Sequence, residues 1–352
     1  MTEEQERLRR RRKKAMLRRQ ILKKRIALTV IALAGVGVGI YSACVIRAEK
    51  AEQKEIQQKK EEQAAKEKAE EERKQERKDA HQEAEEEQVQ VMENLKEDVE
   101  NLLSDFSGEW SVYIQEMNYD NEIVVNNTPM YPASLIKLFA MAASYENMGE
   151  ILEHEKAYAD SEEAAVEEVG RLLEEMITVS DNEAYNELVK LQSADRDFTE
   201  ACSKINAYLE ENGFEDTEVH TTLHPAYSSF DSDNGGDNVT TVKDCGKLLE
   251  QIYKGSCISQ EKSASMLHLL LKQENTVKIP GGLPKGTKVA NKTGETSDVQ
   301  HDVAIVYGEE TDFILCIMTR EFDSEEGVYS DIHELSQMVY ETLNPKKTEK
   351  CG

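Results

Sequence analysis

The stretch YPASLIK, residues 131–137, places a serine and a lysine three positions apart at the start of an apolar helical pattern. Pro132 suits a helix entrance, because its missing N–H would have no partner there. Apolar residues then recur at helical spacing through Ala143. Residues three apart share a helix face, so Lys137 is expected to reach the hydroxyl of Ser134. The pair is a potential nucleophile with its base, although a chance helix start has the same pattern.

Composition separates a charged N-terminal third from a globular remainder. Residues 1–25 hold 12 Lys and Arg against 3 Asp and Glu, a balance of +9 that leaves −36 for the rest out of the total of −27. Phosphate backbones require basic surface, so the acidic part is not expected to bind nucleic acid. The only basic block directly adjoins an apolar segment.

That apolar segment, residues 26–46, contains no Asp, Glu, Lys or Arg. A helix of about 20 apolar residues can cross a bilayer. The excess of Lys and Arg in residues 1–25 predicts a cytoplasmic N-terminus with the C-terminal bulk outside the cell. The stretch YSAC at 41–44 loosely resembles a bacterial lipoprotein cleavage box, and cleavage with lipidation at Cys44 is the alternative. We expect an uncleaved, single-pass anchor in the cell membrane.

Residues 47–100 are predicted to form a charged helical stalk. From about residue 48 to residue 88 the chain is almost entirely Glu, Lys, Gln, Ala and Arg, with no Gly or Pro. These are strong helix formers, and Lys and Glu side chains three or four apart support an exposed helix. Some forty helical residues would extend roughly 60 Å. A coiled coil is the alternative, but apolar a and d positions are missing over most of the run.

The folded domain is predicted over residues 101–345, followed by a short tail at 346–352. Helical patterns dominate from Ser134 to about Leu271, and a last helix is expected at 331–343. The strand-like runs are 110–117, 122–126, 288–292, 302–307 and 313–319. Strands at both ends around a helical middle predict an α+β fold: an antiparallel five-stranded sheet with terminal helices and an inserted all-helical lobe.

The cysteines and histidines indicate neither a disulfide framework nor a metal site. None of the six cysteines forms a C-x-x-C pair, and spacing alone cannot pair them. The His-Glu pairs at 154–155 and 333–334 lack the second histidine of H-E-x-x-H, so no zinc is expected. His301, beside Asp302 on a predicted strand, is the one histidine near a motif, and packing or surface exposure is its ordinary role. No nucleotide or other cofactor is implied.

Two further short motifs lie downstream of Ser134. S-D-N, residues 180–182, is expected on the connection between two helices, where its residue types also favour an N-cap. K-T-G, residues 292–294, ends a predicted strand, and an ordinary strand end would account for it. Each tripeptide is rare by chance in a chain of this length. Their occurrence in this order therefore favours one shared site.

S-x-x-K, S-D-N and K-T-G in this order resemble the signature of the class A β-lactamase and penicillin-binding protein superfamily. Flanking stretches are similar too, among them MITV at 176–179, GLP at 282–284 and HDVAIV at 301–306. The resemblance spans about residues 104–343 and leaves the anchor and stalk outside. It implies a serine β-lactamase-like fold.

The resemblance also implies the chemistry of the first two motifs. Ser134 would attack a carbonyl carbon to form an acyl-enzyme. Lys137 would either take the proton of Ser134 or change the electrostatic field around its hydroxyl. Ser180 would pass a proton to the leaving nitrogen. Asn182 would hold Lys137 and the amide of the substrate by hydrogen bonds.

The K-T-G motif would bind the substrate. Lys292 and Thr293 would bind the carboxylate shared by β-lactams and D-alanyl-D-alanine ends, and the charge of Lys292 would lower the pKa of Lys137. Gly294 completes the motif. By analogy, the backbone N–H groups of Ser134 and Glu295 would form the oxyanion hole.

Departures from the family pattern concern acyl release and substrate charge. The Ω-loop motif E-x-x-L-N, which supplies the glutamate that hydrolyses the acyl-enzyme in class A enzymes, is absent from the sequence. No arginine lies between Asp197 and Thr319, so the arginine-to-aspartate bridge of the Ω-loop neck is not expected. Glu295 stands where the family has a small residue, and its carboxylate is expected to repel anionic substrates. Spacing leads to five candidate acids for release, which are more simply read as solvated loop carboxylates: Glu215, Asp216, Glu218, Asp231 and Asp233.

The sequence therefore predicts a membrane-anchored, extracellular serine hydrolase of the class A β-lactamase type with a small-molecule substrate. Ser134 would be acylated by β-lactams or by peptides that end in D-alanine. One alternative is a D,D-peptidase of the cell wall. The other is a sensor module that binds penicillin or muropeptides without hydrolysing them.

Overall fold

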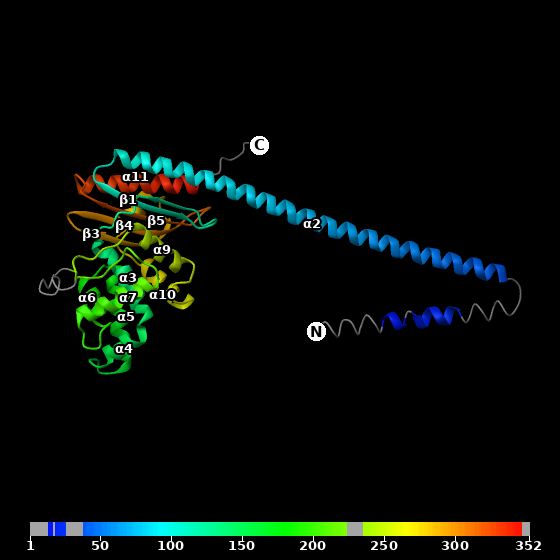
Figure 1. Ribbon diagram of the computed structural model, residues 1–352, viewed down its shortest axis with the longest axis horizontal. Helices are drawn as coiled ribbons and strands as arrows, with labels where there is room; N and C mark the ends of the chain where they lie inside the picture. Colours follow the sequence, from blue (N-terminus) through cyan, green and yellow to red (C-terminus); the bar gives the residue numbers. More distant parts are fainter. Residues whose placement is uncertain (1–12, 17, 26–37, 224–234, 347–352) are drawn as a thin grey trace. The chain divides into compact units, whose positions relative to one another are not determined.

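The computed structural model describes residues 13–16, 18–25, 38–223 and 235–346. The chain divides into two compact units, Met1–Glu83 and Ala84–Gly352. Helix α2, Val38–Asp105, runs from the first unit into the second (Figure 1). Within the first unit its exposed Lys and Glu side chains pair four residues apart, as in Lys66–Glu62 at 2.7 Å.

The predicted membrane segment, residues 26–46, begins outside the described residues, which resume at Val38. In the part of the chain that the structure describes, no helix combines the length and the apolar character needed to cross a bilayer.

The second unit contains one antiparallel sheet, as predicted, with the strand order β2-β1-β5-β4-β3. The strands are β1 Glu109–Glu116, β2 Glu122–Val125, β3 Lys288–Glu295, β4 Val299–Tyr307 and β5 Phe313–Arg320. Strand β3 continues beyond its predicted end, because its pairing with β4 extends to Glu295 opposite Gln300. K-T-G therefore lies at the end of this edge strand, as predicted, and the strand closes one residue later at Glu295.

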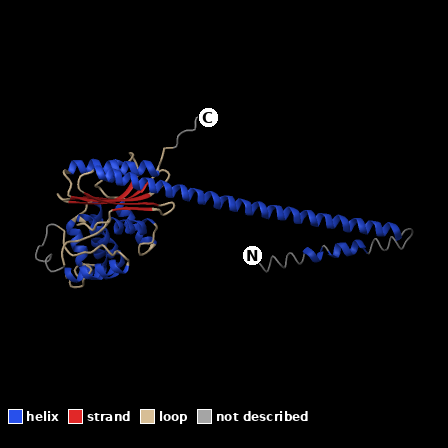
Figure 2. Ribbon diagram, turned by 45° about the horizontal axis from the view of Figure 1, so that its top comes forward, coloured by secondary structure: helices blue, strands red, loops and turns tan. Residues whose placement is uncertain are grey.

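Helices cover both faces of the sheet (Figure 2). On one face, the part of α2 after Ala84 lies beside α11, Glu325–Leu343, and buries Leu95 and Val99 in a cluster with Ile332. On the other face lies a helical lobe (Figure 1). Its α-helices are α3 Ile136–Glu146, α4 Met148–Lys156, α5 Glu162–Thr178, α6 Asn182–Lys190, α7 Phe198–Glu211, α9 Val242–Tyr253 and α10 Gln260–Leu270.

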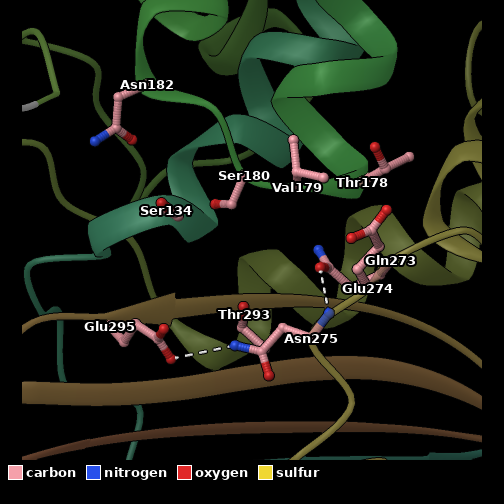
Figure 3. Close-up of a pocket in the computed structure, with 10 residues that line it drawn as sticks. All are labelled: Ser134, Thr178, Val179, Ser180, Asn182, Gln273, Glu274, Asn275, Thr293 and Glu295. Carbon is pink, nitrogen blue, oxygen red and sulfur yellow. Dashed lines mark hydrogen bonds between the residues drawn. The ribbon is translucent and has the colours of Figure 1, made fainter.

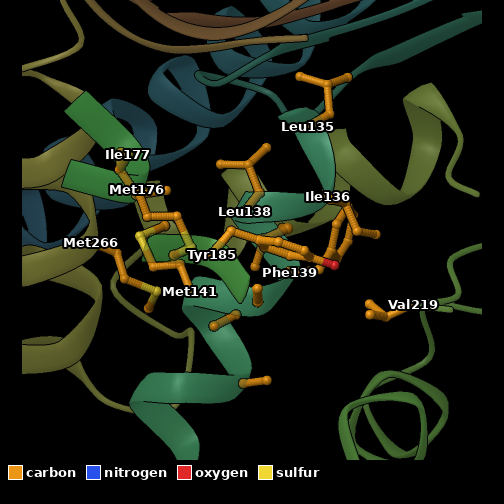
Figure 4. Packing of buried hydrophobic residues seen from close by; sticks show 14 of the residues in the cluster. Leu135, Ile136, Leu138, Phe139, Met141, Met176, Ile177, Tyr185, Val219 and Met266 are labelled. Atoms are coloured by element: carbon orange, nitrogen blue, oxygen red, sulfur yellow. The ribbon is translucent and has the colours of Figure 1, made fainter. Parts of the chain in front are cut away.

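Helix α3 is the centre of this lobe. It is mostly apolar, and nine of its 11 residues are buried, Lys137 among them, as expected of a helix enclosed by others. Figure 4 shows Phe139 and Met141 of α3 packed among side chains of the neighbouring helices, including Tyr185 of α6. Two short 3₁₀ helices, η1 Ala133–Leu135 and η2 Ile279–Gly282, lie beside the sheet. The 3₁₀ helix η1 is thus held between α3 in the lobe and strands β3 and β4 of the sheet.

Candidate active site

Ser134 lies in η1, directly before α3, and not in the first α-helical turn as predicted. The backbone of Ala133 has φ 46°, a left-handed conformation that is uncommon for a residue with a side chain. Such strain persists only where the surroundings impose it. Here Leu135 is fully buried and its N–H donates to Pro132 O at 3.0 Å, which holds the turn closed.

Lys137 is fully buried one turn further on, and its ammonium lies at the centre of the site. The distance from Nζ to Ser134 Oγ is 3.0 Å. Nζ also lies 2.5 Å from Ser180 O and 2.6 Å from Asn182 Oδ1. The structure therefore brings the S-x-x-K and S-D-N motifs together.

Burial, together with the charge of Lys292, lowers the pKa of Lys137 to about 6. A neutral amine has two N–H donors and one lone pair. If the two N–H groups serve Ser180 O and Asn182 Oδ1, the lone pair is left for the hydroxyl proton of Ser134. The geometry suits proton transfer from Ser134 to Lys137.

The S-D-N motif lies where the connection from α5 enters α6: Ser180 and Asp181 precede the helix, and Asn182 is its first residue. The Asp181 carboxylate caps α6 by accepting the N–H of Ala184 at 2.7 Å, so the N-cap interpretation holds for this residue. Ser180, with φ 60°, turns its side chain toward the two lysines. Its Oγ lies 3.2 Å from Lys137 Nζ and 2.8 Å from Lys292 Nζ, which places one hydroxyl between two potential proton donors.

The K-T-G motif reaches the same site from the sheet. Lys292 is fully buried and bonds to Ser180 Oγ and to Thr293 O, at 2.8 and 2.7 Å. Burial lowers the pKa of Lys292 to about 7. Thr293 lines the pocket in front of it.

Gly294 lets the strand approach the nucleophile turn. A Cβ at this position would lie 2.5 Å from Pro132 O and 3.1 Å from Leu135 N, closer than side-chain atoms approach backbone. Only a glycine therefore permits the observed packing of β3 against η1.

A pocket of about 490 Å³ opens beside Ser134. Figure 3 shows Ser134 and Ser180 close together, with Thr293 on the strand below them. The segment 273–275 after α10 forms another wall, because the N–H of Glu274 donates to Thr178 O at 3.0 Å. Pockets of this size hold small molecules. The site is therefore open to a ligand at the nucleophile.

Buried polar groups behind the pocket, among them Asp302 and Lys278, make contacts that were not predicted from the sequence. Asp302 accepts from Asn291 Nδ2 and from the N–H of Ile279, each at 3.0 Å, and burial raises its pKa to about 7. Lys278 is fully buried and pairs with Glu295 at 2.8 Å. The position of Asp302 directly after His301 on a predicted strand was the only available signal, since these contacts join distant parts of the chain.

His301 has a packing role. Its Nδ1 accepts from the N–H of Thr319 at 3.1 Å, so Nε2 carries the proton and donates to Tyr131 O at 2.9 Å. The ring is fully buried, which lowers its pKa to about 4 and keeps it neutral. His301 thus ties the nucleophile turn to strand β4.

The candidate acids for release lie apart from this pocket or outside the described residues. Glu215 and Glu218 line a different surface pocket, and Asp216 accepts from Asn127 Nδ2 at 3.3 Å. Asp231 and Asp233 lie outside the described residues. Among the described residues, the carboxylates that line the pocket of Ser134 are Glu274 and Glu295.

A family model described as the β-lactamase enzyme family matches residues 94–343. Among solved structures, the chain is similar to PBP-A, with 22% identity over 70% of this chain and 95% of that one and a TM-score of 0.57. TLA-1 extended spectrum β-lactamase gives 18% identity over 71% and 98%, with a TM-score of 0.58. A β-lactamase from Sphaerobacter thermophilus gives 17% over 67% and 92%, with a TM-score of 0.54. These structures establish the fold. No curated protein matches the chain in sequence.

Proposed function

The chain belongs to the β-lactamase enzyme family, and on that premise we propose that it is a serine hydrolase acylated at Ser134 by β-lactams or by cell-wall peptides that end in D-alanine. The observation that carries the proposal is the contact of 3.0 Å between Lys137 Nζ and Ser134 Oγ at an open pocket. One of the similar structures, a PBP-A mutant, is an acyl-enzyme complex with penicillin G.

Acylation would proceed in two steps, each of which includes one proton transfer. Lys137 takes the hydroxyl proton of Ser134 while Oγ bonds to the carbonyl carbon. The C–N bond then breaks, and the leaving nitrogen receives a proton through the Ser180 hydroxyl, which lies within 3.2 Å of both lysine ammonium groups. The backbone N–H groups of Ser134 and Glu295 would stabilise the oxyanion.

Substrate binding would use the K-T-G strand. The Lys292 ammonium and the Thr293 hydroxyl are the groups proposed to bind a substrate carboxylate, and Asn182 would hold the amide of the acyl side chain. No cofactor takes part in this scheme.

The fate of the acyl group separates the β-lactamase from its alternatives. The three described candidate acids do not line the pocket of Ser134, an observation that favours slow release. A D,D-peptidase or a sensor that stays acylated would then account for the same site.

The location is proposed from the sequence. Residues 26–46 would anchor the protein in the cell membrane, with residues 1–25 in the cytoplasm and the β-lactamase-like domain outside the cell.

Incubation with a radiolabelled penicillin tests the proposal, with mass and bound label followed over time beside Ser134→Ala. We expect a covalent adduct on the wild-type protein and none on the variant. Loss of label with release of ring-opened product identifies a β-lactamase, whereas a persistent adduct identifies a binding protein or peptidase. A wild-type protein that never forms an adduct contradicts the proposal.

A further inference from the structure

Among the residues that the structure describes, Glu295 is one of two carboxylates that line the pocket of Ser134, the other being Glu274, and it pairs with a buried lysine behind the pocket. Its Oε2 lies 2.8 Å from Nζ of Lys278, which is fully buried. The same ammonium lies 3.1 Å from His301 O and 3.4 Å from Gly294 O. An ammonium has three N–H donors, so these three acceptors can use all of them.

The Glu295 carboxylate lies between Lys278 and the pocket. Glu295 lines the pocket and its side chain is 45% exposed, whereas the Lys278 side chain is 0% exposed and does not line the pocket. Asn275 also contacts the carboxylate, with 3.5 Å between Nδ2 and Oε2 (Figure 3). The charge of Lys278 therefore meets a ligand only after Glu295 has moved.

Glu295 also lies beside the proposed carboxylate-binding residue. Side chains two apart on a strand project from the same face, and both Thr293 and Glu295 of β3 line the pocket. A substrate carboxylate bound at Thr293 would thus approach the Glu295 carboxylate. Two neighbouring carboxylates repel each other, and the repulsion is greater where solvent is partly excluded.

We propose that Glu295 determines the charge preference of the pocket by holding the Lys278 ammonium in place of a carboxylate from the acyl donor. This inference rests on the proposed function, since it concerns donors that acylate Ser134. The wild-type protein then disfavours anionic donors relative to donors with an uncharged group at the same position. Removing the carboxylate makes one Lys278 N–H available to an incoming anion and removes the repulsion.

Benzylpenicillin and its methyl ester are suitable probes, because they share the ring and the acyl group and differ only in the carboxylate. The second-order rate constant of acylation is measured for both, from ring-opening absorbance and adduct mass. In Glu295→Gln and Glu295→Ala, we expect the acid-to-ester ratio of rate constants to rise about tenfold, the effect of one charge-assisted hydrogen bond. Because the ratio is taken within each variant, a change in the folded fraction cancels.

Glu274→Gln is the matched control. Glu274 is exposed, lines the same pocket and carries the same charge, but its carboxylate does not contact Lys278. Its loss should change the ratio less than about twofold, because the Lys278 ammonium stays paired with Glu295 and the Glu274 charge alone is screened by solvent and salt.

Three results would overturn the inference. If both Glu295 variants are acylated but keep the wild-type acid-to-ester ratio, the inference is wrong while the proposed function stands. An equal rise in Glu274→Gln would assign the preference to the general charge of the pocket. A wild-type protein that reacts with neither donor would overturn both the inference and the proposed function.

Discussion

A lysine can act as a base only after it has lost its proton, so the surroundings of Lys137 determine what Ser134 can do. Lys137 is buried, and Lys292 lies on the other side of the Ser180 hydroxyl. Burial and this neighbouring charge lower the pKa of Lys137 to about 6, so the neutral amine predominates near neutral pH.

The rate of acylation by benzylpenicillin should therefore pass through a maximum with pH. It should rise as pH increases through about 6, where Lys137 loses its proton. It should fall above about 7, where Lys292 loses the charge proposed to attract the carboxylate. The acylation rate for the methyl ester should show the same rise near pH 6 but fall much less above about pH 7, because the ester has no carboxylate for Lys292 to attract. Rate constants of acylation measured from about pH 5 to 9 test this expectation.

A different profile would contradict these roles. A rate that still increases above about pH 9 would mean that the base has the ordinary pKa of a lysine. An equal fall in the acylation rates of the acid and the ester above about pH 7 would show that Lys292 does not bind the substrate carboxylate.

Short motifs marked the residues that the structure brings together at the pocket, whereas their roles in catalysis stay predictions. Ser134, Lys137, Ser180, Asn182, Lys292 and Thr293 meet in the structure as the motif order indicated. Lys278 and Asn291 were not predicted, because their roles depend on contacts with Glu295 and Asp302 that no local pattern reveals.

Strand β3 and helix η1 meet at Gly294, and the position of Ser134 depends on this contact between two elements. Gly294→Ala should place a Cβ 2.5 Å from Pro132 O, so β3 must move away from η1. We expect the free energy of unfolding to fall by about 1–3 kcal/mol. The acylation rate should fall roughly 100-fold, because a shift of about 1 Å misaligns the nucleophile. Chemical denaturation and acylation kinetics measure the two effects.

Gly170→Ala is the control for Gly294→Ala. No heavy atom lies within 4 Å of a Cβ at Gly170, which is inside α5, so alanine should stabilise the helix by up to about 1 kcal/mol. If both variants had the same stability and acylation rate as wild type, the close approach at Gly294 would have no importance for the site.

The elements were predicted better than their ends. Strand-like apolar runs located all five strands, and apolar residues at helical spacing located the enclosed helix α3. The end of β3 was misplaced because polar residues in K-T-G and Glu295 look like a loop, whereas pairing with β4 keeps them extended. Ladder hydrogen bonds between strands are long-range contacts, so local propensity does not report them.

On the scale of the whole molecule, the sequence combines a β-lactamase-like domain with segments outside the family match. The match begins at residue 94, after the basic tail, the predicted anchor and most of the charged helix. The continuous helix α2 through residues 47–100 agrees with the composition of strong helix formers. The anchor and the domain boundaries remain predictions.

Protease added to intact cells tests the proposed topology. An extracellular domain should be cut within residues 47–83 and released, because an exposed charged helix opens more readily to proteases than the packed part of α2 after Ala84. Removal of residues 1–46 should release the domain from the membrane fraction. Survival of the domain on intact cells, with digestion only after lysis, would contradict the outward orientation.

Peptide mapping after reaction with benzylpenicillin tests the central claim most directly. The protein is incubated with the β-lactam, quenched in acid, digested and analysed by mass spectrometry beside Ser134→Ala. We predict the penicilloyl group on the hydroxyl of Ser134 and an unmodified variant. A wild-type protein without adduct, or an adduct on another residue that persists in Ser134→Ala, would contradict the account.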